Sequence, residues 1–600
     1  MLNARQKENL VVVAAYVATV LLSLRMFFGI GVTTDDDFQY FLTARTPFSN
    51  WMTDAQIYAH GAGRFYFLVT KVFYYVPYLF DSFVWTKAVQ YITLMACYGM
   101  FAYTVARMLR SRGLGALVLL LLVWGLSVTP NMHMPTIAYP FYFAFSTILF
   151  MAGLLLYLRY TERGGYWRVW LSAIVMLVCF LFYETYLIYA FMFAIAIMAH
   201  HRFRLGDKTL WRDVLPLAGM AVLYVGCYFG YRQYLLASTP DLVFYDGSSF
   251  DPQKFSFKGF VNIVLRCTRG ALPTQNYFGN KELIAANSLL EGGHSNGLMR
   301  VFTHASALVW ITALLQTALL WWITGRRWFA KLSWWQVTVG LVVSVVGAFA
   351  AHLLVAVATK YNGELSSCLP GYVTTFYSYL FVMLAIALVI VASFKVFGNG
   401  IVVRGVWAIL FLMAAVITGY ANEHIAREWH KSGQRMEIID RMAQEGCFDR
   451  LPHNAIVYTG ELHNTPGMAF LCSYQTHDIE HYINLRAGRV VSTTDDTNTL
   501  VERSQLAPDA PVYYLHAQCS PKGADILVAM ARLDSTLTTA TEADVFYLSP
   551  AKSFDVYYCA DGQWHRQPVR VGRRQRLAQC HIEVDGIDPR SIVASNMPID

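Results

Sequence analysis

The stretch Gly31-Val-Thr-Thr-Asp-Asp-Asp-Phe-Gln-Tyr40 directly follows the first long apolar segment, residues 10–30. An apolar run of this length can cross a bilayer as one helix. The consecutive carboxylates Asp35, Asp36 and Asp37 therefore stand where the chain has just left the membrane. On spacing alone, such a run most often caps a helix or lies in a solvated loop. The rest of the chain favours a functional site instead.

The composition indicates a polytopic membrane protein. Of the 600 residues, 56% are hydrophobic and 15% aromatic, and only 14% are charged. This is too apolar for an ordinary soluble protein and too long for one domain. The formal charge of +8 does not indicate a nucleic-acid partner, because much of the Lys and Arg lies in short loops between apolar segments, as the positive-inside rule requires.

Eleven apolar segments predict about eleven transmembrane helices. Arg5 and Lys7 precede the first segment and place the N-terminus in the cytoplasm. Each predicted inner loop carries Lys or Arg, whereas the two long outer loops, 33–84 and 237–299, carry the acidic runs. The first segment is long enough to remain as an anchor, so we expect no cleavable signal peptide.

The aromatic-rich stretch 65–80 lies inside the first outer loop. Lys71 and Pro77 interrupt it, so we expect a helix that lies in the membrane interface rather than a further span. Its aromatic side chains are expected to pack at the interface rather than to stack on a sugar. Counting this stretch as a span would invert every later segment, and the charge pattern argues against that.

The composition changes after residue 420. Runs such as Ala455-Ile-Val-Tyr458, Pro511-Val-Tyr-Tyr-Leu515 and Asp544-Val-Phe-Tyr547 are rich in β-branched and aromatic residues, which is typical of strands. We therefore expect residues 421–600 to form a soluble α/β or mixed domain on the outer face, with a supporting or acceptor-recognition role. It contains no phosphate-cradling Gly-rich loop and no clear metal-ligand spacing.

Half of the ten cysteines lie in this C-terminal part. An oxidising compartment would permit disulfides among them. Because their number is odd, at least one stays free or pairs elsewhere, and the sequence does not give the connectivity. They are Cys447, Cys472, Cys519, Cys559 and Cys580.

The first outer loop offers the groups that a transferase with a lipid-phosphate donor needs. Such an enzyme needs a base that takes a proton from the acceptor hydroxyl. It also needs cations beside the phosphate, because the leaving group gains negative charge as its bond breaks. Asp36 and Asp37 suit the first task, and Arg64 and Lys71 suit the second.

This layout resembles the integral-membrane glycosyltransferases of the GT-C class. The matching positions are Asp36-Asp37-Phe-Gln-Tyr40, Gly63-Arg64, Tyr183-Glu184 and Lys360-Tyr361. The chain is most similar to bacterial polytopic transferases that take a sugar from a polyprenyl-phosphate carrier, such as the O-antigen glucosyltransferases of polysaccharide biosynthesis. The resemblance covers roughly residues 10–420.

The resemblance implies a GT-C-like transmembrane domain over residues 1–420 and a reaction that inverts the anomeric carbon. It implies an acidic base in the first outer loop, which here is Asp36 or Asp37. The neighbouring carboxylate then has another role, such as a metal ligand. Many members of the class bind a divalent cation, Mg²⁺ or Mn²⁺, but oxygen ligands are too generic here to assign one.

The resemblance also implies partners and a location. The donor is a polyprenyl-phosphate-linked sugar, the acceptor is a glycan or a lipid, and membrane lipids surround the protein. The location is the bacterial inner membrane in the cell envelope, with several spans, a cytoplasmic N-terminus and a periplasmic C-terminal domain.

The other candidate residues each have a structural alternative. Arg64 can anchor lipid headgroups, and Glu184 can form a buried hydrogen bond at a helix end instead of facing a cavity. Lys360 can bind phosphate or extend to the interface as a snorkelling lysine. The remaining candidates for substrate binding are Asp35, Tyr40, His60, His133, Tyr183, Tyr245, Asp246 and Tyr361.

Transport is the main alternative function. A transporter or flippase for lipid-linked glycans is favoured by inverted hydropathy repeats and by charges at mid-membrane. Glu184 is the one strong intramembrane candidate, and it lies near the end of its segment. An assembly scaffold would make the Asp35–Asp37 run dispensable. No nucleotide-binding fingerprint is present, so the sequence predicts a GT-C-like transferase.

Overall fold

The computed structural model describes most of the chain and divides it into two compact units. Unit 1 comprises Met1–Phe28 and Thr43–Ala426, and unit 2 comprises Gly29–Leu42 and Arg427–Asp600. The described residues are 4–28, 30–31, 35–129, 133–202, 204, 206, 208–279, 297–326, 329, 332–363, 371–444, 446–449, 451–460, 476–519, 526–537, 539–548, 553–560, 563–570, 575–581 and 594–595.

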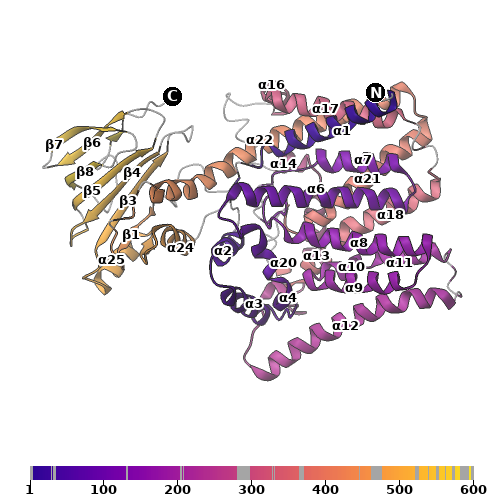
Figure 1. Ribbon diagram of the computed structural model, residues 1–600, viewed down its shortest axis with the longest axis horizontal. Coiled ribbons are helices and arrows are strands. Elements are labelled where there is room, and N and C mark those ends of the chain that lie inside the picture. The colour runs from indigo at the N-terminus through magenta and orange to yellow at the C-terminus, as the bar shows by residue number, and fades with distance from the viewer. Residues whose placement is uncertain are drawn as a thin grey trace. The chain divides into compact units, whose positions relative to one another are not determined.

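Unit 1 is a bundle of apolar helices, and neighbouring helices such as α6, α8 and α9 lie side by side (Figure 1). Six helices are long and apolar enough to cross a membrane: α6 (Phe83–Met108), α8 (Tyr142–Arg163), α12 (Lys208–Ser238), α17 (Ala307–Gly325), α21 (Thr375–Phe397) and the Ile401–Arg427 part of α22 (Ile401–Gln444). Five shorter apolar segments are part of α1 (Ala4–Leu24), α7 (Arg112–Trp124), α9 (Trp167–Phe182), α10 (Thr185–Tyr189) with α11 (Phe191–His200), and α18 (Trp334–Ala350).

These helices show a multi-pass membrane protein with a mostly helical first unit. In chain order they coincide with the eleven apolar segments of the sequence. Because five of them are shorter than a helix that spans a bilayer by itself, the count of eleven transmembrane helices stays a prediction.

Serine side chains fix the start of several helices. Ser82 before α6 and Ser111 before α7 each accept a hydrogen bond from the backbone N–H three residues later. Ser333 before α18 does the same, and Gln336 completes a capping box there. Such caps satisfy N–H groups that have no partner inside the helix.

The prediction of one helix over residues 65–80 is wrong, whereas its position in the membrane interface stays a prediction. The stretch is helical only in short pieces: α4 (Phe67–Thr70), α5 (Val72–Tyr75) and the 3₁₀ turn η1 (Val76–Tyr78). Its rings pack inward: Tyr74 stacks on Tyr142 at 3.9 Å between centroids, and Phe73 lies 5.0 Å from Phe182. Inward packing of rings against α8 and α9 takes the place of one continuous helix.

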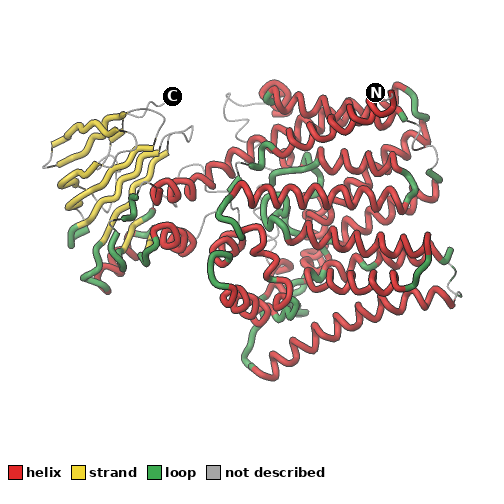
Figure 2. Tube along the Cα trace, viewed as in Figure 1, coloured by secondary structure: helices red, strands yellow, loops and turns green. Residues whose placement is uncertain are grey.

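Unit 2 has mixed α/β character, as predicted, and holds the strands of the structure (Figure 2). The predicted runs at 455–458, 511–515 and 544–547 fall in or beside β1 (Ile456–Tyr458), β3 (Val512–Cys519) and β5 (Thr539–Leu548). The larger sheet has the order β2-β1-β3-β4-β5-β8, with β1 parallel to β2 and β3 and the other pairs antiparallel. Its remaining strands are β2 (Ser492–Thr494), β4 (Ile526–Leu533) and β8 (Gln575–His581).

A second, three-stranded sheet of unit 2 has the order β7-β6-β9, and its pairs are antiparallel. The strands are β6 (Ser553–Ala560), β7 (Gln563–Arg570) and β9 (Ala594–Ser595). The side chains of Cys472, Cys519, Cys559 and Cys580 lie outside the described ones, so disulfides in this part stay a prediction.

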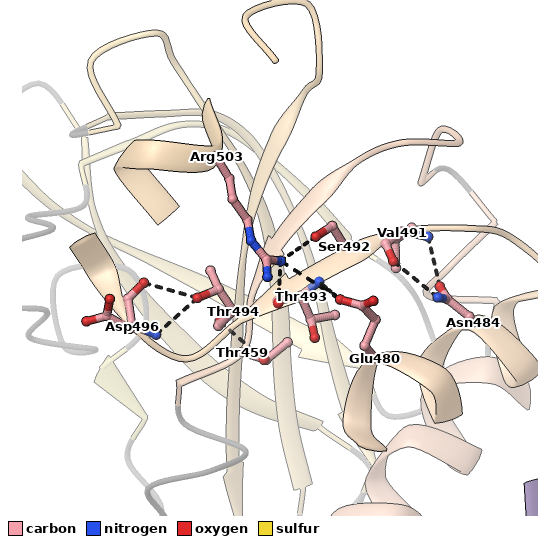
Figure 3. A network of polar contacts seen from close by, with 9 residues as sticks. All are labelled: Thr459, Glu480, Asn484, Val491, Ser492, Thr493, Thr494, Asp496 and Arg503. Atoms are coloured by element: carbon pink, nitrogen blue, oxygen red, sulfur yellow. Dashed lines mark hydrogen bonds and ion pairs between the residues drawn. The ribbon is translucent and has the colours of Figure 1, made fainter. Parts of the chain in front are cut away.

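Two helices hold the edge strand β2 through polar contacts (Figure 3). Arg503 of α25 (Thr497–Leu506) donates to the Thr493 carbonyl at 2.8 Å, and Glu480 of α24 (Thr476–Ala487) accepts from the Thr493 N–H at 2.7 Å. The side chain of Asn484 exchanges two hydrogen bonds with the backbone of Val491. Side chains thus form hydrogen bonds with backbone groups that an edge strand otherwise leaves unpaired.

The helix that begins with the Asp run also belongs to unit 2. This helix, α2 (Asp35–Thr43), packs against α24: the rings of Phe38 and Phe41 lie 5.5 and 5.9 Å from the ring of Tyr482. The sequence places this segment in the first outer loop but gives no sign of its association with the C-terminal part.

Candidate active site

A break between α9 and α10 creates the centre of the candidate site. Tyr183 is extended (φ −158°, ψ 131°), so α9 ends at Phe182 and α10 begins at Thr185. At this break the Glu184 Oε1 atom lies 2.8 Å from the Nε atom of Arg64, and the two side chains are only 14% and 21% exposed. Two charges this far from water are tolerated because they are paired.

Arg64 keeps its charge in this setting. Burial opposes the charged form, but the attraction of Glu184 outweighs it, so the pKa of Arg64 lies above its ordinary value. Arg64 is therefore a cation beside Glu184 in unit 1.

Gly63 positions Arg64 against the second outer loop. It ends α3 (Phe48–Ala62) in the left-handed conformation (φ 62°). A Cβ atom at this position would lie 2.8 Å from the ring of Phe244 and 3.3 Å from Arg232 Cγ. Glycine is required both for the backbone conformation and for this close approach.

Hydrogen bonds join the first outer loop to the second. The Tyr245 N–H donates to the Gly61 carbonyl at 2.9 Å, and the Ser248 hydroxyl donates to the Ala62 carbonyl at 2.8 Å. Arg232, near the end of α12, donates to the Ser248 carbonyl at 3.0 Å. Two distant parts of the sequence, around residues 61–62 and 232–248, thus form one hydrogen-bonded wall.

A third loop closes this wall. The Thr359 N–H donates to the Ser249 carbonyl at 3.0 Å, and Lys360 Nζ donates to the Tyr245 hydroxyl at 2.6 Å. The segment follows α19 (Leu353–Val357) and opens α20 (Thr359–Gly363). Val355 and Tyr361 belong to an apolar cluster with residues of α13 (Phe257–Gly270), which holds the segment in place.

An apolar cavity of about 450 Å³ lies beside the ion pair. Among the described residues, Arg64 and Arg232 are the cations that line it and Glu184 is the carboxylate. Tyr224 and Phe229 contribute to its walls, together with α19 residues such as Val355. The cavity thus combines mostly apolar walls with two arginine side chains in its lining.

The structure thus brings several predicted residues together and leaves others elsewhere. Arg64, Tyr183 and Glu184 line the cavity. Tyr245 and Lys360, which donates to it, are in the hydrogen-bonded loops beside the cavity but not among its lining residues. Asp246 is exposed and begins the 3₁₀ turn η2 (Asp246–Ser248), and His60 lies in the last turn of α3.

Tyr361 and His133 belong to a row of aromatic side chains in contact with one another. The Tyr361 and Tyr372 hydroxyls are 2.5 Å apart, and the His133 ring lies 5.6 Å from that of Tyr372. His133 Nδ1 is 3.1 Å from the Tyr139 hydroxyl. Neither residue lines the cavity.

Lys71 is buried away from the cavity lining, and its side chain is 1% exposed. Its Nζ atom lies 3.2 Å from the centroid of the Tyr58 ring and 3.9 Å from Asp54 Oδ2. Cation–π contact and the carboxylate satisfy its charge. Lys71 therefore stabilises the packing of the 65–80 stretch.

The Asp run belongs to unit 2, whereas Arg64 belongs to unit 1. Asp35, Asp36 and Asp37 form the first turn of α2, but their side chains lie outside the described ones. Tyr40 lies further along the same helix and is buried.

Arg232 is a residue of the site that the sequence analysis missed. It lies within the apolar seventh segment, near its end. A charged residue in such a segment is costly unless it faces a cavity or a partner, so this signal was present in the sequence.

A divalent cation does not fit the described lining of the cavity. Mg²⁺ and Mn²⁺ need several oxygen ligands. Glu184 is the one carboxylate among the lining residues, and it is paired with Arg64. The described lining is therefore suited to an anion.

Comparisons with known proteins place the chain at a distance from all relatives found. No family model matches it, and no curated protein matches it. Among solved structures it is similar to ArnT from Cupriavidus metallidurans in the apo state, with 13% identity, 87% of this chain and 94% of that chain covered, and a TM-score of 0.35. It is also similar to ArnT bound to undecaprenyl phosphate (13%, 86% and 94%, TM-score 0.34).

A further similar structure is the Archaeoglobus fulgidus oligosaccharyltransferase in complex with Zn and sulfate (12% identity, 84% of this chain and 68% of that chain, TM-score 0.34). Identities and TM-scores of this size carry no conclusion about activity, so the function has to be argued from the residues of the site.

Proposed function

We propose that this chain is an integral-membrane glycosyltransferase of the GT-C type. It moves a sugar from a polyprenyl-phosphate carrier to a glycan or lipid acceptor on the outer face of the bacterial inner membrane. The observation that carries this proposal is the buried Arg64–Glu184 pair beside an apolar cavity that Arg232 also lines.

The cations suit a phosphate. A guanidinium has several N–H donors in a planar fork. Arg64 can hold Glu184, and Arg232 can hold the Ser248 carbonyl, while other N–H groups of each donate to phosphate oxygens. Lys360 adds a positive charge in the same wall.

The walls suit a lipid. Tyr224, Phe229 and Val355 offer little to a free sugar phosphate but match a hydrocarbon chain. The cavity also lies at an end of the membrane helices, where a phosphate on a membrane-embedded chain resides. Undecaprenyl phosphate, which is bound to the similar ArnT, belongs to this class of lipid.

The proposed reaction is a displacement at the anomeric carbon. The acceptor hydroxyl attacks this carbon and gives its proton to Asp36 or Asp37 as base, while the bond to the phosphate oxygen breaks. Polyprenyl phosphate leaves with increased negative charge, which the arginines stabilise. Attack opposite the leaving group inverts the carbon.

Binding of the carrier lipid tests the site first. Native mass spectrometry of the purified full chain measures polyprenyl phosphate retained by wild type, by Arg232→Gln and by the double variant Arg64→Gln/Glu184→Gln. The double variant keeps the buried site neutral. We expect each to lower affinity about tenfold or more, since a charge-assisted hydrogen bond contributes about 1.5–3 kcal/mol.

The matched control is Lys258→Gln, which removes an exposed cation outside the cavity lining. Equal binding by all four proteins would remove the support for a lipid-phosphate donor. Binding without sugar transfer, together with passage of lipid-linked glycan across vesicles, would favour the transporter instead.

The base is tested by Asp36→Asn and Asp37→Asn, singly and together. We expect loss of transfer by about 10²-fold or more in the variant that removes the base, with the lipid affinity unchanged. Full transfer activity in both single variants and in the double variant would exclude this assignment.

A further inference from the structure

A second cavity, of about 620 Å³, lies at the opposite end of the membrane helices. Helix α18 relates the two cavities: Trp335 in its first turn lines this one, and Val355, just beyond its last turn, lines the first. By the charge rule, this is the end that the sequence predicts to be cytoplasmic.

The cavity has an apolar interior and a cationic rim. Buried residues such as Met151, Met192 and Leu384 line the interior. The rim carries three arginines, Arg107, Arg110 and Arg202, and one carboxylate, Glu162. The surplus at the rim is therefore two positive charges.

The arginines of the rim differ in their partners. Arg107 forms an ion pair with Glu162. For Arg110 and Arg202, which are exposed, no ion pair occurs within the part of the chain that the structure describes. These two guanidinium groups remain available to an anion.

The backbone at both arginines is unusual. Arg110 follows α6 and Arg202 follows α11, and both have a φ of 51°. Glycine or asparagine normally occupies such left-handed positions at helix ends, because a Cβ atom is unfavourable there. Two long cations at two unfavourable positions on one rim indicate a role for the side chains.

Exposed tryptophans mark the depth of the rim. Trp334 is 51% exposed and Trp335 is 65% exposed. Tryptophans are enriched where membrane helices reach the headgroup region. The rim therefore lies at the level of lipid phosphates, and the interior extends below it among α6, α8, α11, α18 and α21.

We propose that this cavity binds an anionic phospholipid of the surrounding leaflet. Its phosphate lies between Arg110 and Arg202, and an acyl chain lies in the apolar interior. Basic pockets between membrane helices on the cytoplasmic side recognise anionic headgroups in this way. The bound lipid fills space between five helices and so stabilises unit 1 without entering the candidate active site.

The test uses the full chain in detergent and two readouts: thermal unfolding, and lipid adducts in native mass spectrometry. Phosphatidylglycerol is compared with phosphatidylcholine and inorganic phosphate. We expect a saturable rise of Tm with phosphatidylglycerol and little with the other two. Arg110→Asn/Arg202→Asn lowers its affinity about tenfold or more, while asparagine tolerates the left-handed backbone.

Arg163→Asn is the matched control, because Arg163 is exposed at the end of α8 but does not line the cavity. Ala199→Phe is a second variant that narrows the rim and leaves both arginines in place; it too must weaken lipid binding. The proposal is overturned if the Asn double variant binds phosphatidylglycerol as wild type does. An equal effect of phosphatidylcholine or inorganic phosphate would overturn it as well.

Discussion

Arginines at the two ends of the membrane helices differ in burial and in pairing. At one end, Arg64 is buried, paired with Glu184 and held by a left-handed glycine. At the other, Arg110 and Arg202 are exposed and themselves adopt the left-handed conformation. A buried charge has to be paired, and pairing fixes its position, as a reacting phosphate requires. An exposed charge without a protein partner suits a ligand that exchanges with the bilayer.

The largest loss of stability is expected when the Arg64–Glu184 pair is broken. Arg64→Ala leaves Glu184 buried without a partner, so we expect a loss of stability of about 3 kcal/mol, whereas Arg64→Gln/Glu184→Gln recovers most of it. Thermal unfolding in detergent measures both. A single variant as stable as the double variant would show that the pair is exposed to water in solution.

Gly63→Ala tests the rigidity of the same end with a smaller expected effect. The left-handed backbone alone makes alanine unfavourable by about 1–2 kcal/mol, and the contact with Phe244 adds to this. Adding Phe244→Ala should relieve only the contact, so the double variant should regain part of the stability. No difference between Gly63→Ala and wild type in thermal unfolding would contradict the described turn.

The smallest expected effect is a gain in stability rather than a loss. Arg110→Gly and Arg202→Gly each relieve a left-handed residue at a helix end, so we expect a gain of at most about 1 kcal/mol in lipid-free detergent. With phosphatidylglycerol present, the gain should vanish or reverse, because the variants lose the bound lipid. Destabilisation in lipid-free detergent would show that these side chains hold the fold itself.

Some features of the fold and the site could be predicted from the sequence, and others depend on tertiary packing. Apolar length and loop charge locate the membrane helices, and they also single out Arg64, Glu184 and Lys360, because charged residues at the ends of apolar segments stand out. Arg232, near the end of the seventh apolar segment, carried the same signal and was missed. The burial of Lys71 among aromatic rings depends on tertiary packing, which no local pattern reports.

The association of α2 with unit 2 was beyond the reach of the sequence for a related reason. The contacts of Phe38 and Phe41 with Tyr482 join residues more than 400 positions apart, from 41 to 482. A pairing at this separation is a property of the complete chain. The base proposed from the Asp run therefore remains a prediction from the sequence.

The wall of the candidate site also has a consequence for synthesis. Its hydrogen bonds join Gly61 and Ala62 to Tyr245 and Ser248, and Ser249 to Thr359. A nascent chain that has emerged only to residue 250 contains both charges of the buried pair but lacks the last part of the wall. Since chains fold as they are made, the site is completed late, after most of the membrane helices have been synthesised.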